Sequence, residues 1–64
     1  MEKQYFELLI MGVESDIYNV MCECVLAGAM SPTGNKFEYK IEGMTNNIMA
    51  LTKALKNNHC TIVH

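Results

Sequence analysis

The stretch IYNVMCECVLAGAM, residues 17–30, carries only two clearly polar side chains, Asn19 and Glu23. Because these two are four residues apart, they would form one narrow polar stripe along a helix. The rest of the helix would be apolar nearly all round, and such a helix is buried on more than one side. The remainder of a 64-residue chain is too small to cover it. We therefore expect a helix that ends near Gly28 and is covered by a second chain.

The length of the chain favours the same interpretation. Sixty-four residues form one domain at most, residues 1–64. A core below ~70–80 residues rarely supplies more than ~3–5 kcal/mol, and natural mini-proteins add disulfides, a metal or oligomerisation. Three cysteines cannot all pair within one chain, so reduced thiols in a cytosolic compartment are the simpler interpretation. The sequence thus predicts a homodimer that Val25→Asp or Leu26→Asp would abolish, unless either change unfolds the chain.

Charge and hydropathy argue against two classes of partner. The net charge is −2, and all five positive charges are lysines. Nucleic-acid-binding proteins usually cluster positive charge and favour arginine, so we do not expect nucleic-acid binding. The apolar helix of ~14 residues is short of the ~20 that cross a membrane. Glu2 and Glu7 interrupt the apolar run behind Lys3, so we expect no signal peptide and a cytoplasmic protein.

Residues 5–13 predict a central strand, because the run is apolar apart from one charge. Ser15 would cap the helix that follows, with Asp16 in its first turn. Side chains alternate along a strand, so this strand has two distinct faces. We expect one face to carry Phe6, Leu8 and Ile10, and the other to carry Tyr5, Glu7, Leu9 and Met11.

Residues 31–35, SPTGN, are the clearest turn in the chain. Ala29 and Met30 just before it could form a short strand, in which case the turn closes a hairpin. Residues 36–42 alternate without an error, which predicts a strand that ends at Gly43. Its inward side chains would be Phe37, Tyr39 and Ile41, and its outward ones Lys36, Glu38, Lys40 and Glu42.

A second helix is expected after this strand, with Thr45 as its N-cap. Its end is expected at Asn57-Asn58, because asparagine tolerates the left-handed conformation. Residues 59–64 would then close the chain as a strand. One apolar stripe at helical spacing would face the core, formed by Met44, Ile48, Leu51 and Leu55.

The order of elements predicts an α+β domain, a small ferredoxin-like (βαββαβ) sandwich with two helices on one face of an antiparallel sheet. Its second strand would be very short, and if Ala29 and Met30 form no strand the sheet has three strands. This order is similar to that of the small ACT-like regulatory domains, which are ferredoxin-like and often dimerise to bind small ligands. The resemblance covers the whole chain but no motif. The turn at residues 12–16 lacks the usual proline-glycine, so no functional residue is carried over.

The candidate chemical groups do not form a site in the sequence. Cys22 and Cys24 point ~200° apart around a helix and cannot chelate one ion, so we expect packing, or else an intermolecular disulfide. Cys60 and His64 would lie ~13 Å apart along a strand, which leaves only a metal site shared between chains. His59 and Cys60 would point to opposite faces, so no nucleophile pair forms. We expect no cofactor, no metal and no enzymatic activity; an enzyme would need a site assembled from two chains.

The uncovered face of the sheet is the candidate binding surface, because an apolar centre with a charged rim is typical of an interface. On that face Glu7 would either pair with Lys40 across the sheet or mark the polar centre of an interface. The residues expected at an oligomer or partner interface are Tyr5, Leu9, Met11, Tyr18, Cys22, Val25 and Leu26.

We therefore expect a non-enzymatic homodimer that binds and inhibits or tethers a larger protein. Small proteins from phages and mobile elements that inhibit host defence enzymes are the analogy. The alternative is an ACT-like module that binds a small ligand at the dimer interface or between the first helix and the sheet. The sequence does not specify the partner, the ligand, the source organism or the face that dimerises.

Overall fold

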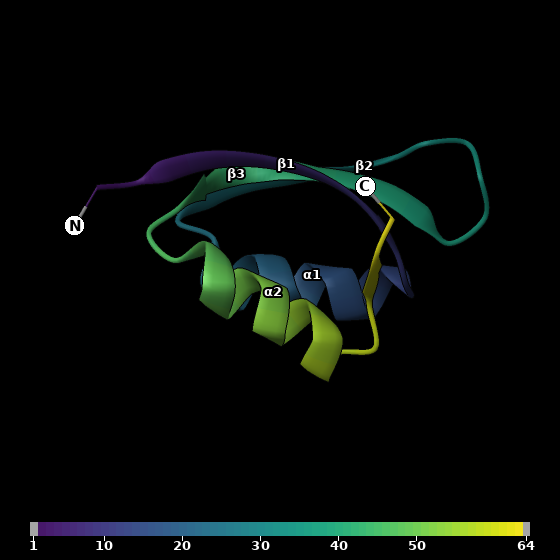
Figure 1. Cartoon of the computed structure of the whole chain (residues 1–64). Coiled ribbons are helices and arrows are strands. Elements are labelled where there is room, and N and C mark those ends of the chain that lie inside the picture. Colours follow the sequence, from purple (N-terminus) through teal and green to yellow (C-terminus); the bar gives the residue numbers. More distant parts are fainter. Residues whose placement is uncertain (1, 64) are drawn as a thin grey trace.

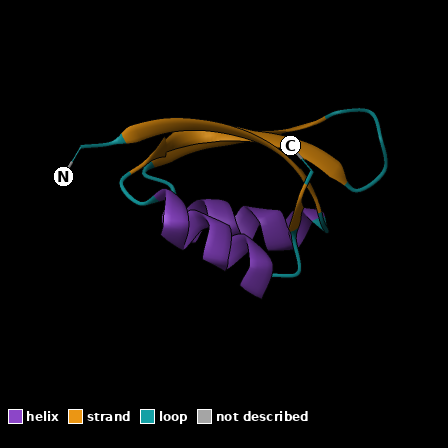
Figure 2. Ribbon diagram, viewed as in Figure 1, coloured by secondary structure: helices purple, strands orange, loops and turns teal. Residues whose placement is uncertain are grey.

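Four antiparallel strands form one sheet, and two helices cover one of its faces (Figures 1 and 2). The computed structural model describes residues 2–63, so His64, and with it the expected separation of Cys60 and His64, lies outside the described residues. The strands are adjacent in the order β2-β3-β1-β4. The α+β class with two helices and an antiparallel sheet is therefore confirmed. The elements are β1 (Gln4–Met11), α1 (Glu14–Cys24), β2 (Ala27–Pro32), β3 (Glu38–Thr45), α2 (Ile48–Asn57) and β4 (Thr61–Ile62).

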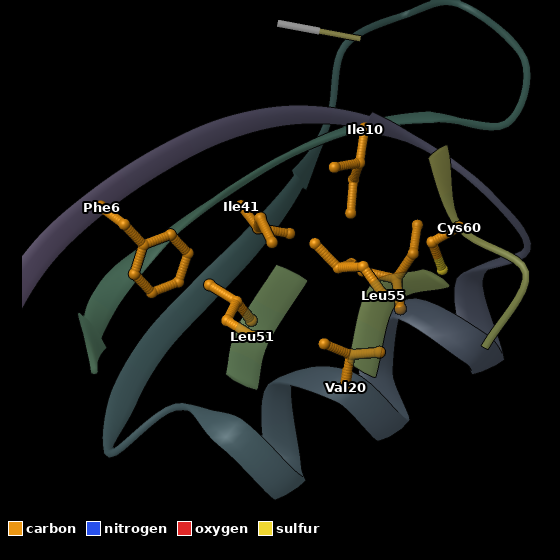
Figure 3. Close-up of a cluster of buried hydrophobic side chains, with 8 residues drawn as sticks. Phe6, Ile10, Val20, Ile41, Leu51, Leu55 and Cys60 are labelled. Carbon is orange, nitrogen blue, oxygen red and sulfur yellow. The ribbon is translucent and has the colours of Figure 1, made fainter. Parts of the chain in front are cut away.

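The core lies between the helices and the sheet (Figure 3). Phe6 and Ile10 of β1 are buried there, with Leu8 partly buried beside them, which confirms the predicted inward face of β1. The expected face of α2 is confirmed for Ile48, Leu51 and Leu55, which pack against the core. The expectation for Met44 is wrong, because Met44 lies in β3 opposite Tyr5, on the face away from the helices. The remaining members of the buried cluster are Ile17, Val20, Ile41 and Cys60.

The first helix is shorter than predicted and is not apolar all round. It ends at Cys24, and its buried residues are Ile17 and Val20. Val25 already has extended backbone angles, φ −115° and ψ 126°. The expectation of a helix to Gly28, buried on several sides, is therefore wrong. The apolar stretch was long because it contains eight of the eleven residues of α1 and four of the six residues of β2.

The residues after α1 form a full strand, which corrects the expectation of a very short or missing second strand. β2 pairs with β3 over six positions, from Ala27 opposite Met44 to Pro32 opposite Tyr39. The residues of β2 are mostly small, and the β-branched and aromatic residues that are typical of strands are absent from it. The sequence therefore did not indicate a strand of this length. Pairing with the strongly patterned β3 fixes its conformation.

β3 also differs from its prediction at both ends. Phe37 lies outside the strand, 52% exposed and with a left-handed φ of 62°, so it is not an inward residue. Gly43 does not end the strand, which continues to Thr45. A side chain at Gly43 would meet backbone atoms of β2, because its Cβ would lie 2.6 Å from the Cα of Gly28. Gly43 therefore does not end the strand; its lack of a side chain allows β2 and β3 to pair closely.

The caps of both helices differ from the expected ones. Ser15 lies inside α1, whose N-cap is Val13 without a side-chain hydrogen bond. Thr45 is buried at the end of β3 and does not cap α2. The N-cap of α2 is Asn47, whose Oδ1 accepts a hydrogen bond from the amide of Ala50 at 3.0 Å. Ser, Thr and Asn all have a side-chain oxygen that can cap a helix, so the residue type alone does not show whether Thr45 or Asn47 is the N-cap of α2.

The chain leaves α2 through a left-handed residue, but that residue is His59, with φ 62°. Asn58, the C-cap, has φ −101° and ψ 22°. The final strand is only Thr61–Ile62, much shorter than the predicted 59–64, and pairs with Ile10 and Met11 of β1. Among the residues described, no helix is long and apolar enough to cross a membrane.

Candidate functional site

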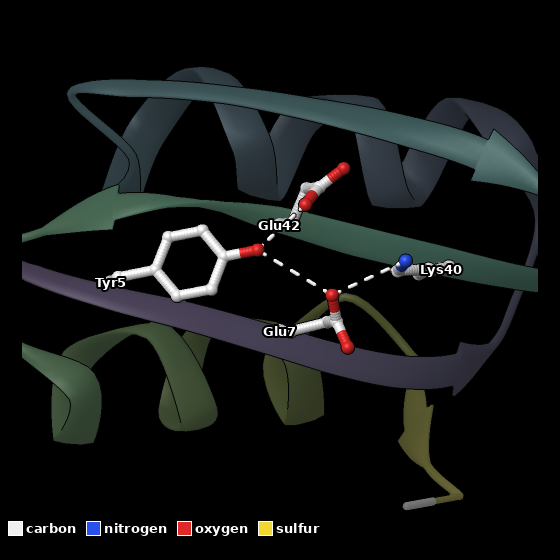
Figure 4. Close-up of polar contacts among 4 residues, drawn as sticks. All are labelled: Tyr5, Glu7, Lys40 and Glu42. Atoms are coloured by element: carbon white, nitrogen blue, oxygen red, sulfur yellow. Dashed lines mark hydrogen bonds and ion pairs between the residues drawn. The ribbon is translucent and has the colours of Figure 1, made fainter.

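The face of the sheet opposite the helices is uncovered within the described residues, and we call it the open face (Figure 4). Tyr5 is 60% exposed there and Met11 is 44% exposed, while Leu9 is half-buried. The predicted outward side of β1 is therefore confirmed. The antiparallel register places four pairs side by side on this face: Tyr5 with Met44, Glu7 with Glu42, Leu9 with Lys40, and Met11 with Glu38.

A polar network crosses β1 and β3 at the centre of the open face (Figure 4). Glu7 and Glu42 are directly opposite each other, which alone would be unfavourable. The Tyr5 hydroxyl donates to Glu42 Oε2 at 2.7 Å and lies 3.4 Å from Glu7 Oε2. The Lys40 ammonium forms an ion pair with Glu7 Oε2 at 3.2 Å, which confirms the expected Glu7–Lys40 pairing. The network thus holds two like charges next to each other.

The network changes the chemistry of the tyrosine. The hydrogen bond to Glu42, some desolvation and the negative charges of both carboxylates raise the pKa of Tyr5 to about 12. Removing the phenolic proton would leave a third negative charge beside two carboxylates. At neutral pH Tyr5 is therefore protonated and donates its hydrogen bond to Glu42.

The open face carries more negative than positive charge. Glu7, Glu38 and Glu42 lie on it, and Lys40 is the one cation that the register of β1 and β3 places among them. The Glu38 carboxylate accepts hydrogen bonds from Thr33 Oγ1 at 2.6 Å and Asn35 Nδ2 at 2.8 Å. These bonds lower the pKa of Glu38, so the carboxylate stays charged at the edge of the face.

The structure does not bring the seven predicted interface residues into one surface. Tyr5, Leu9 and Met11 share the open face, as described above. The other four lie in the helix layer or at the end of α1. Tyr18 is 61% exposed and Leu26 is 57% exposed; Cys22 is exposed on α1, and Val25 is partly buried against the core.

A cavity of about 410 Å³ lies between the end of α1 and the start of α2. The sequence interpretation missed it, because it depends on Thr45 ending a strand where a helix was expected to begin. The Cys24 thiol points toward the carbonyl oxygen of Ala50 at 3.9 Å across this region. Its lining residues are Cys22, Glu23, Cys24, Val25, Leu26, Thr45, Asn46, Asn47 and Ala50.

Within residues 2–63, Cys22, Cys24 and Cys60 form no disulfide with one another. Burial raises the pKa of the Cys24 thiol, with a smaller contribution from Glu23, and burial likewise raises the pKa of Cys60. A raised pKa suppresses the thiolate that nucleophilic catalysis needs. Among residues 2–63 no three His, Cys, Asp or Glu side chains are grouped in a way that could hold a metal ion.

Comparison of the chain with known protein families, with characterised proteins and with solved structures finds no match.

Proposed function

We propose that the protein is a non-enzymatic interaction protein that acts as a homodimer and binds a larger protein through its open face. The supporting observation is the exposure of Tyr5 and Met11 on a sheet face whose opposite side holds the entire buried core. Aromatic and methionine side chains are enriched at the centres of protein interfaces. Binding there would inhibit or tether the partner.

The charge of the open face favours a partner surface that carries lysine or arginine. Three carboxylates, those of Glu7, Glu38 and Glu42, surround the apolar residues, and within the paired residues of β1 and β3 Lys40 is the one cation among them. Positive groups on the partner would be steered toward this face and would fix its orientation. Tyr5, held by Glu42, would present a preorganised aromatic ring beside them.

The test is capture of a partner by the wild-type protein and by the double variant Tyr5→Ala/Met11→Ala. We expect the double variant to lose the captured protein. Met49→Ala is the matched control, because Met49 is 83% exposed on α2 and lies in the helix layer. Equal capture by all three proteins would reject the open face as the binding surface. Capture should also weaken with added salt, since screening removes the steering.

We further propose that the fold is the ferredoxin-like sandwich. The support is the strand order, in which β3 separates β1 from β2 and α1 connects these two, as in a split βαβ unit. A cytoplasmic location is proposed from the three free cysteines, since reduced thiols persist in that compartment.

Small-ligand binding is a second candidate, and the observation that favours it is the cavity of about 410 Å³ at the helix ends. Ligand pockets commonly measure ~300–1,000 Å³. A thermal-shift screen of amino acids and nucleotides tests it, because a ligand at a hundredfold excess over its Kd stabilises by about 2.7 kcal/mol. Ala50→Trp, which would fill the cavity, should remove the shift. A screen with no shift rejects this candidate.

A further inference from the structure

The outer edge of β2 is an open strand edge without charged side chains. β2 ends the sheet order, and within residues 2–63 it pairs only with β3. Natural proteins protect such edges with charged side chains, prolines, bulges or covering segments, and of these β2 has Pro32 at its end. Residues 25–35, which include all of β2, contain no charged residue. The other open edge, along β1, carries Lys3 and Glu7 next to and within the strand.

The pairing of β2 with β3 determines which backbone groups this edge exposes. The amide of Thr33 donates to the carbonyl oxygen of Glu38 at 3.3 Å, toward β3. In an antiparallel ladder these groups alternate from residue to residue. Gly28 and Met30 therefore direct their N–H and C=O groups away from β3, toward the open edge. Pro32 has no N–H to offer there.

An exposed flank of α1 that carries Tyr18 and Cys22 lies above the same edge. Met21 lies over β2, because a side chain added at Gly28 would meet its Cε at 2.7 Å. Cys24 lies on the other side of the helix, where its thiol approaches Ala50 of α2. Because each residue of a helix is rotated by about 100° from the one before it, Tyr18 and Cys22 lie next to Met21 around the helix axis, on the side opposite Cys24 and therefore away from α2. Tyr18, 61% exposed, therefore projects on the flank above the open edge.

We propose that two copies of the chain pair edge to edge through β2, as antiparallel strands related by a two-fold axis at Ala29. This proposal specifies the interface of the homodimer proposed above, and it rests on that proposed function. Gly28 would then exchange backbone hydrogen bonds with Met30 of the partner subunit, and the missing N–H of Pro32 would fall outside these pairs. The two sheets would form one, and the flanks that carry Tyr18 would meet above the seam.

Charge selects a second copy as the occupant of this edge. A two-fold axis places the same surface of both copies against each other, so a dimer through the open face would oppose two surfaces that each carry Glu7, Glu38 and Glu42 against one Lys40. The neutral stretch 25–35 can meet its own copy without repulsion. Edge pairing also leaves the open face free, so that one continuous surface of two copies faces the larger partner.

Sedimentation equilibrium of the wild type and of Ala29→Lys tests the proposal. Ala29 is exposed, and the axis would place the two lysines directly opposite each other. We expect a wild-type dimer whose Kd rises about tenfold or more in Ala29→Lys. Met49→Lys, which adds the same charge on α2, should keep the wild-type Kd. Mixing Ala29→Lys with Ala29→Glu should restore dimers, because opposite charges then meet at the axis.

Tyr18→Lys gives a second variant that leaves the open face and the strand pairing unchanged. It should also raise the dimer Kd while it still captures the larger partner, with circular dichroism showing an intact fold. Hydrogen exchange adds a local readout, because the amide of Met30 should exchange slowly in the dimer and rapidly after dilution. A dimer whose Kd is unchanged by Ala29→Lys and Tyr18→Lys overturns the edge pairing but not the homodimer. A wild type that stays monomeric at all concentrations overturns both.

Discussion

Gly28 of β2 lies directly opposite Gly43 of β3, and neither position has room for a side chain. Both lie on the helix side of the sheet, under the end of α1, where a Cβ at either position would lie within 3 Å of Val25 Cγ1. The pair lets β2 and β3 approach closely and lets α1 end close to the sheet. The turn from α1 into β2 therefore depends on two glycines that are far apart in the sequence.

Gly43→Ala should destabilise the domain by about 1–3 kcal/mol, the usual cost of overpacking. The new methyl group would lie 2.6 Å from the Cα of Gly28, and backbone atoms cannot move away cheaply. Elsewhere in a strand the same change would stabilise by about 0.5–1 kcal/mol, so the sign of the effect is diagnostic. Urea unfolding measures it, and Ser31→Ala on exposed β2 surface is the control. A more stable Gly43→Ala variant would contradict the close approach.

Val25→Asp and Leu26→Asp should have different effects on the fold, although the residues are neighbours. Val25 is partly buried against the core, and a carboxylate there would lose hydration without a partner, which costs about 3 kcal/mol. Leu26 is 57% exposed, so its replacement should change the free energy of unfolding by no more than about 0.5 kcal/mol. Circular dichroism during urea unfolding compares them. Equal losses would show that Leu26 is covered in the folded protein.

Ionisation of Tyr5 should be displaced to high pH by its carboxylate neighbours. Its pKa is raised from the ordinary value of 10 to about 12. A raised pKa means that the hydrogen bond to Glu42 stabilises the fold fully below pH 10 and stops doing so as pH rises through about 12. The difference in absorbance titration at 295 nm between wild type and Tyr5→Phe isolates this phenol. Glu42→Gln should bring its pKa back toward 10; an unchanged titration would show that the hydrogen bond is absent.

Glu38 should stabilise the β2–β3 hairpin only while it is ionised. Hydrogen bonds from Thr33 and Asn35 lower its pKa. A lowered pKa gives a contribution that is present above the ordinary pKa of a glutamate and is lost as pH falls through the lowered value. Thr33→Val should therefore destabilise the protein at neutral pH and have less effect in acid. The carboxyl carbon shift of Glu38, followed by NMR, should show a higher pKa in Thr33→Val than in the wild type, with Thr52→Val on α2 as the control.

The open face could be predicted from the sequence because strand alternation is a local rule. Tyr5, Leu9 and Met11 alternate with Phe6, Leu8 and Ile10, and the pairing of Glu7 with Lys40 was one of the two alternatives that this alternation suggested. The α2 stripe of Leu51 and Leu55 was predictable for the same reason, since its period is unambiguous. These features needed no knowledge of tertiary contacts.

The end of α1 could not be predicted, because its cause lies outside the stretch itself. Residues 25–30 are compatible with a helix or a strand, and short apolar runs do not distinguish the two. The choice is made by β3, which pairs with β2 from Ala27 to Pro32. The cavity at the helix ends was missed for the same reason, since its lining residue Thr45 belongs to β3 and not to α2.

The buried hydroxyl of Thr45 joins the two helix ends. It donates to the carbonyl oxygen of Cys24 at 2.8 Å and accepts from the amide of Asn47 at 3.2 Å. Fraying of the last turn of α1 would remove one of its partners, and fraying of the start of α2 would remove the other. Because an unsatisfied buried hydroxyl is costly, these two segments should open together, as a single cooperative unit on the time scale of local unfolding.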